Sequence, residues 1–85
     1  MKFKVFGHHE CPWCDKALAL LDERGLPYSY LNVRTNDHAR GDLLRMGYRT
    51  VPQVFLEKHA GLDMKHIGGF EDLERHLDRP MIDNI

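Results

Sequence analysis

The chain has 85 residues, which is the size of one small domain. Its hydrophobic fraction of 42% and charged fraction of 29% are ordinary for a globular protein and exclude a disordered or fibrous chain. A net charge of −1 gives no electrostatic reason to expect binding to nucleic acid or to an anionic membrane. The sequence shows neither an apolar run of about 18 residues nor the pattern of a signal peptide, so we expect a cytosolic protein.

Strand and helix patterns alternate along the chain. Residues 2–6 alternate polar and apolar side chains, which predicts a strand with Phe3 and Val5 on the same face. The remaining patterns predict, in order, a helix over 12–24, a strand over 28–33, a helix over about 38–46, a strand over 51–56, a hairpin loop over 57–63, a strand over 64–67 and a helix over 70–77.

This order predicts one mixed sheet, because a strand-helix-strand unit makes a parallel pair and the later hairpin is antiparallel. Helices are expected over the faces of the sheet. We expect a single domain over 1–85, in which 78–85 form a tail without a periodic pattern. Nothing in the sequence indicates an obligate oligomer, so a monomer is expected.

Both cysteines fall in residues 11–14, which read Cys-Pro-Trp-Cys, at a predicted strand-to-helix junction. A disulfide across so short a loop constrains the unfolded chain little, so redox chemistry explains the pair better than stabilisation does. Pro12 suits the first position of a helix, so free amides and the positive helix end would surround the sulfur of Cys11. We therefore predict that Cys11 is the attacking thiolate and that Cys14, on the same helix face and more buried, resolves the intermediate.

Two other interpretations of the cysteines are weaker. A structural zinc needs four ligands, and the sequence offers one Cys pair with His8 and His9 nearby but no second pair at ligand spacing. Inert buried cysteines would need an apolar surrounding, which Glu10 and Asp15 do not provide. No metal is therefore expected.

Two further segments are predicted to lie at the same end of the sheet. Thr50, Val51 and Pro52 open the third strand, and a proline at a strand entrance can re-orient the backbone beside a site. The pair Gly68-Gly69 precedes a helix start, which suits either a plain tight turn or a carboxylate site.

Together, the motifs at residues 11–14, 50–55 and 66–73 resemble those of a dithiol glutaredoxin of the small bacterial or phage type. The resemblance covers nearly the whole chain. It implies a thioredoxin fold, with a four-stranded mixed sheet in the order β-α-β-α-β-β-α flanked by three helices. It also implies glutathione-dependent disulfide exchange, with Cys11 forming the mixed disulfide and Cys14 releasing the reduced product.

The resemblance further implies a glutathione site beside Cys11. The Val51 backbone would pair with the cysteinyl part of glutathione, next to a cis bond to Pro52. The amides of Gly69 and Phe70, with Glu71 and Asp72, would hold the γ-glutamyl end, and Asp72 would be the partner of its ammonium group. The residues assigned to this site are His8, Pro12, Trp13, Thr50, Val51, Pro52, Gly69, Phe70, Glu71 and Asp72.

His8 departs from the family pattern, which commonly has Lys or Arg three residues before the first cysteine. A histidine is largely neutral above about pH 6.5, so it would stabilise the thiolate less. Arg34, Arg45 and Arg49 are the candidates for the missing charge at the glycyl carboxylate, and the sequence does not rank them.

Three functions are consistent with this sequence. The first is reduction of protein disulfides and glutathione mixed disulfides by glutathione, with ribonucleotide reductase as a possible client by family analogy. The second is the same fold reduced by thioredoxin reductase, since thioredoxins and glutaredoxins differ by some tens of millivolts in potential. The third is an iron–sulfur cluster carrier with glutathione as co-ligand, which Pro12 disfavours because it stiffens the turn beside Cys11.

Overall fold

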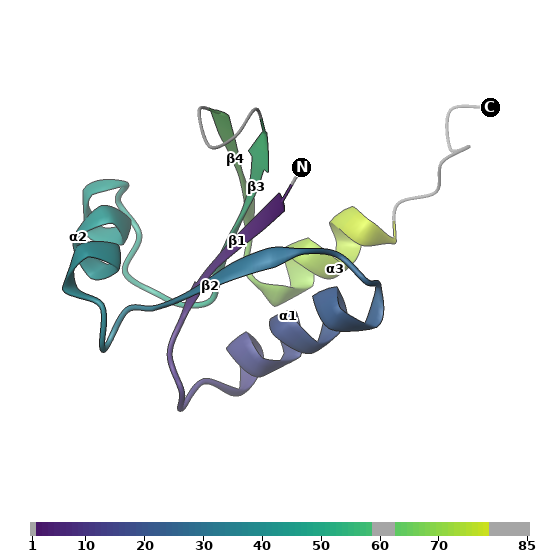
Figure 1. The fold of residues 1–85 in the computed structure, drawn as a ribbon, viewed down its shortest axis with the longest axis horizontal. Helices are drawn as coiled ribbons and strands as arrows, with labels where there is room; N and C mark the ends of the chain where they lie inside the picture. Colours follow the sequence, from purple (N-terminus) through teal and green to yellow (C-terminus); the bar gives the residue numbers. More distant parts are fainter. Residues whose placement is uncertain (1, 59–62, 79–85) are drawn as a thin grey trace.

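A computed structural model describes residues 2–58 and 63–78, in which three helices cover a four-stranded sheet (Figure 1). The elements in chain order are β1 (Lys2–Gly7), α1 (Pro12–Glu23), β2 (Tyr28–Asn32), α2 (Asp37–Arg45), β3 (Gln53–Lys58), β4 (Asp63–Gly68) and α3 (Phe70–Leu77). The predicted four-stranded mixed sheet with three helices is therefore confirmed. No helix within the described ranges is long and apolar enough to cross a membrane.

The strand order β2-β1-β3-β4 brings strand ends from distant parts of the sequence together at one end of the sheet. β1 runs parallel to β2 and antiparallel to β3, and β3 runs antiparallel to β4. Phe6 pairs with Gln53, and Val54 pairs with Gly68. The end of β1, the start of β3 and the end of β4 therefore meet, and they carry the three motifs singled out in the sequence.

The core has two layers, one on each face of the sheet. α1 and α3 lie on one side and α2 lies on the other (Figure 1). Because side chains alternate across a strand, Phe3 and Val5 pack in the layer of α1 and α3, whereas Phe6 packs in the layer of α2. The first layer comprises Phe3, Val5, Ala17, Leu20, Leu21, Val54, Leu56 and Leu73, and the second comprises Phe6, Val33, Ala39, Leu43 and Phe55.

Most element boundaries differ from the prediction by one or two residues, and two of these differences have a clear cause. β3 begins at Gln53 rather than at residue 51, since Pro52 has no N–H to donate and the first ladder pair with β1 is made by Gln53. α2 begins one residue earlier than expected, because the side chain of Asn36 caps it by accepting from the N–H of Ala39 at 3.0 Å. The predicted loop over 57–63 was too long, because Glu57 and Lys58 continue β3 and pair with Met64 and Asp63 of β4. The rest of that loop and most of the tail lie outside the described residues.

Candidate active site

The two cysteines flank the first turn of α1. Helix α1 starts at Pro12, and Cys11 is its N-cap with an extended backbone, as predicted. The Cys14 N–H donates to the Cys11 sulfur at 3.1 Å, and the two residues form a disulfide with Cα atoms 5.1 Å apart. An amide and the positive end of a helix both favour negative charge on this sulfur. In the reduced protein, Cys11 is therefore the cysteine whose thiolate is stabilised.

The two cysteines are buried to different extents. Cys14 is fully buried, whereas Cys11 keeps 7% of its surface exposed. A Cβ at Gly7 would lie 2.9 Å from the Cys14 sulfur and 3.1 Å from the Tyr30 ring, so only glycine leaves room for the sulfur there. Burial, with a smaller contribution from Asp15, raises the pKa of the Tyr30 phenol, which therefore stays neutral next to Cys14.

The segment before β3 faces Cys11. The carbonyl oxygen of Val51 lies 3.9 Å from the Cys11 sulfur, and the peptide bond between Val51 and Pro52 is cis. The cis bond agrees with what the family resemblance implies. A cysteine-containing peptide that pairs in an extended conformation with the Val51 backbone would hold its cysteine sulfur close to Cys11.

A cavity of about 480 Å³ opens beside this segment. It brings together eight of the residues predicted for the site, namely Trp13, Thr50, Val51, Pro52, Gly69, Phe70, Glu71 and Asp72. Its lining also includes four residues that were not predicted, namely Tyr48, Gln53, His66 and Gly68. The sequence signals for these additions were the turn at Gly68-Gly69 and a polar residue in each of two paired strands, Gln53 and His66.

The start of α3 forms the acidic end of this cavity. The Gly69 N–H donates to the carboxylate of Asp72 at 3.1 Å, so this predicted anion-binding amide is already occupied. The amides of Phe70 and Glu71 belong to the first helical turn, which has no preceding carbonyl groups to accept from them. An anionic group can therefore bind at these two amides while a cationic group lies against the carboxylates of Glu71 and Asp72.

Trp13 forms the wall between the cysteines and α3. Its ring packs on Phe70 with centroids 5.8 Å apart, and the Lys16 ammonium lies 4.4 Å above it. The side chain is nevertheless 48% exposed. Trp13 therefore offers an aromatic surface beside the disulfide, and its contact with a partner protein stays a prediction.

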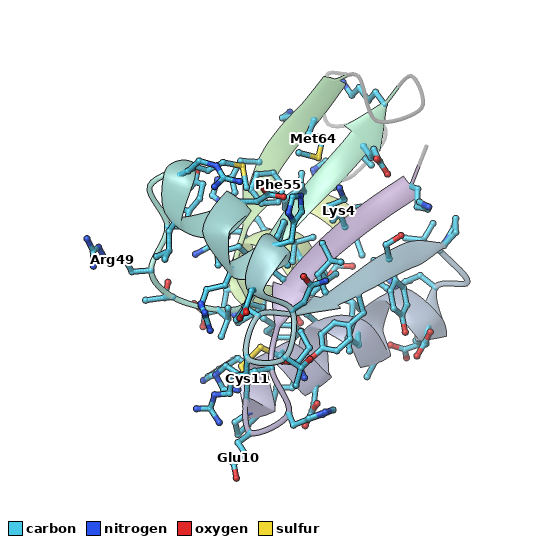
Figure 2. The ribbon with its side chains drawn as sticks, turned by 60° about the vertical axis from the view of Figure 1, so that its left-hand side comes forward. Lys4, Glu10, Cys11, Arg49, Phe55 and Met64 are labelled. Atoms are coloured by element: carbon cyan, nitrogen blue, oxygen red, sulfur yellow. A yellow bond between two sulfur atoms is a disulfide. The ribbon has the colours of Figure 1, made fainter. Side chains whose placement is uncertain are left out.

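His8 lies on the other side of Val51, in a second cavity that is rich in arginine. This cavity of about 480 Å³ is lined by His8, Val33, Arg34, Arg40, Leu43, Leu44, Tyr48, Arg49 and Val51. Arg34 pairs with Glu10 and Arg40 with Asp37, whereas no carboxylate among the described side chains pairs with Arg49. Arg49 extends from the segment after α2 (Figure 2). Arg45, which pairs with Asp42, does not line the cavity.

Comparisons with known proteins agree with this geometry. The glutaredoxin family model matches residues 3–60. Glutaredoxin 3 of Escherichia coli is 35% identical over 71 residues, covering 82% of this chain and 78% of that protein. A buckwheat glutaredoxin–glutathione complex has a TM-score of 0.68 at 29% identity, over 94% of this chain and 72% of that one. The fold is also that of the NrdH-redoxin of E. coli, with a TM-score of 0.72 and 20% identity over 94% of this chain and 97% of that one. That protein is described as glutaredoxin-like with a thioredoxin-like activity profile.

Proposed function

The chain belongs to the glutaredoxin family of thiol–disulfide oxidoreductases, and from this premise we propose that glutathione is its reductant and that Cys11 is its nucleophile. The observation that carries the proposal is the position of Cys11. Its sulfur accepts a hydrogen bond from an amide at the start of α1 and lies 3.9 Å from the carbonyl oxygen of Val51, which lines the cavity with the acidic end.

The chemistry is two successive disulfide exchanges. The Cys11 thiolate attacks one sulfur of a substrate disulfide, and the other substrate sulfur leaves as a thiolate. The Cys14 thiolate then attacks Cys11, which frees the second substrate thiol and forms the Cys11–Cys14 disulfide. Two glutathione molecules return the enzyme to the dithiol form and leave as one molecule of glutathione disulfide. Two electrons pass from glutathione to the substrate in each cycle.

A glutathione mixed disulfide needs only Cys11. The thiolate attacks the glutathionyl sulfur, and the client thiol leaves. A second glutathione thiolate then attacks the mixed disulfide on Cys11 and releases glutathione disulfide. Glutathionylated proteins and ribonucleotide reductase are the clients we propose by family analogy, in a cytosolic setting and with a monomeric enzyme.

The two cavities offer partners for both ends of glutathione. The γ-glutamyl carboxylate fits the amides of Phe70 and Glu71, and its ammonium group fits Asp72. The Val51 backbone pairs with the cysteinyl residue. Arg49 is the best candidate for the glycyl carboxylate, because it lines the cavity of His8 and pairs with no carboxylate among the described residues.

Replacing His8 by Lys should raise the reactivity of Cys11 at neutral pH. The Nδ1 atom of His8 is buried and has no hydrogen-bond partner among the described residues. A lysine would place a permanent positive charge three residues before the nucleophile. We expect the rate of Cys11 alkylation at pH 7 to rise about 2- to 10-fold.

His38→Lys is the matched control, because His38 is an exposed residue of α2 that lines neither cavity. An equal gain in both variants would point to net charge rather than to position 8. Unchanged alkylation and turnover in His8→Lys would contradict the proposed role of this position.

The choice of reductant is tested directly with the wild-type protein. Reduction of a small glutathione mixed disulfide is followed with glutathione and glutathione reductase, and in parallel with thioredoxin reductase as the sole electron source. We expect turnover in the first assay and little in the second. The reverse result would place this glutaredoxin fold in the thioredoxin pathway, which the fold it shares with NrdH-redoxin permits.

A further inference from the structure

We propose that His66 is a positioning residue that holds the Thr50–Pro52 segment in place through the side chain of Gln53. The inference rests on the proposed function, because this segment is the one on which glutathione is expected to lie. Two side-chain hydrogen bonds connect His66 to the loop that faces Cys11.

Two hydrogen bonds make the connection. The Nε2 atom of His66 lies 2.7 Å from the Oε1 atom of Gln53, and the Nε2 atom of Gln53 donates to the hydroxyl oxygen of Thr50 at 3.1 Å. With the Gln53 amide in this orientation its oxygen accepts, so the Nε2 atom of His66 is the donor.

Aromatic packing fixes the histidine ring. The rings of His66 and Tyr48 are stacked, with centroids 4.4 Å apart and an interplanar angle of 25°. The ring of Phe55, which pairs with His66 across β3 and β4, has its centroid 5.0 Å away. The donor of His66 is therefore held in a defined direction before glutathione arrives.

Gln53 transmits this constraint because it is buried. Its exposed fraction is 9%, and an unpaired amide at such a depth would be costly. Satisfying both ends of the amide therefore sets the position of Thr50. Among the described residues, no backbone-to-backbone hydrogen bond outside the helices and strands involves Thr50 or Val51. The two successive side-chain hydrogen bonds from His66 to Gln53 and from Gln53 to Thr50 are therefore a main tether of this segment.

His66→Phe tests the tether, because it keeps a ring against Tyr48 and removes the donor. We expect the KM for a small glutathione mixed disulfide to rise about 2- to 10-fold, the range expected for the loss of one hydrogen bond, while kcat changes by less than about 2-fold. His66→Gln, whose amide reaches the same place, should restore most of the KM. His76→Phe is the matched control, since His76 also packs against an aromatic ring, Phe3, but lies outside the glutathione cavity.

A double-mutant cycle with Thr50→Val provides a second measurement. If both residues act through Gln53, the KM of His66→Phe/Thr50→Val will be close to that of the worse single variant rather than the product of the two effects. Additive effects, an unchanged KM in His66→Phe, or a failed rescue by His66→Gln would overturn the proposal. Failure of the proposed function looks different, because the wild type itself would then show no glutathione-dependent turnover.

Discussion

Replacing Cys11 by Ser should abolish the reduction of a glutathione mixed disulfide, with a loss of more than about 10³-fold in kcat/KM. A serine hydroxyl stays protonated at neutral pH, and the helix start alone cannot turn it into a nucleophile. Sulfur is also the atom that the product disulfide requires. The measurement is glutathione-coupled turnover of a small mixed disulfide, at equal concentrations of folded protein.

Cys14→Ser should separate the two reactions. Its turnover of the glutathione mixed disulfide should stay within about 5-fold of the wild type, because only Cys11 takes part in that exchange. Its reduction of a protein disulfide should fall by more than about 10-fold, since no second thiol can release the client. Loss of both activities in Cys14→Ser, or activity on the mixed disulfide in Cys11→Ser, would contradict the assignment of the two roles.

The fold could be predicted from the sequence because local patterns and global topology agree. The alternation around Phe3 and Val5 does place both side chains in one layer of the core, and the apolar spacing of α3 gives its bounds as Phe70–Leu77. The start of β3 was wrong by two residues. Apolar character favours a strand at Val51, but hydrogen bonding to β1 begins only after Pro52.

The candidate site could be predicted where chemistry is local and not where it depends on register. The position of Cys11 before a helix proline is readable from neighbouring residues, and the structure shows the N-cap. The contact between Gln53 and His66 depends on the pairing of β3 with β4, which the sequence does not specify residue by residue. The ranking of Arg49 above Arg45 likewise depends on which arginine already has a carboxylate partner.

Gly68→Ala should damage both stability and glutathione binding. Gly68 has a φ of +125°, which an alanine adopts only with strain, and a Cβ there would lie 2.7 Å from the Cγ atom of Asp72. We expect a loss of roughly 2–3 kcal/mol in the free energy of unfolding, which lowers Tm by roughly 10–20 °C for a domain of this size. Displacing the Asp72 carboxylate should also raise the KM for a glutathione mixed disulfide by about 10-fold or more, as expected for a hydrogen bond to a charged group.

Gly25→Ala is the control that separates strain from the site. Gly25 also has a positive φ, +67°, but a Cβ there would meet nothing within 4 Å. This variant should lose about 1–2 kcal/mol in the free energy of unfolding and keep the KM of the wild type. Adding Asp72→Ala to Gly68→Ala removes the overlap with the carboxylate but keeps the Cβ of residue 72, which would lie 2.8 Å from the added Cβ. The further cost of the Gly68 substitution in that background should therefore fall only in part. If Gly68→Ala instead lost stability with no change in KM, the Asp72 carboxylate would have no part in binding glutathione, and the acidic end of the cavity would need another ligand group.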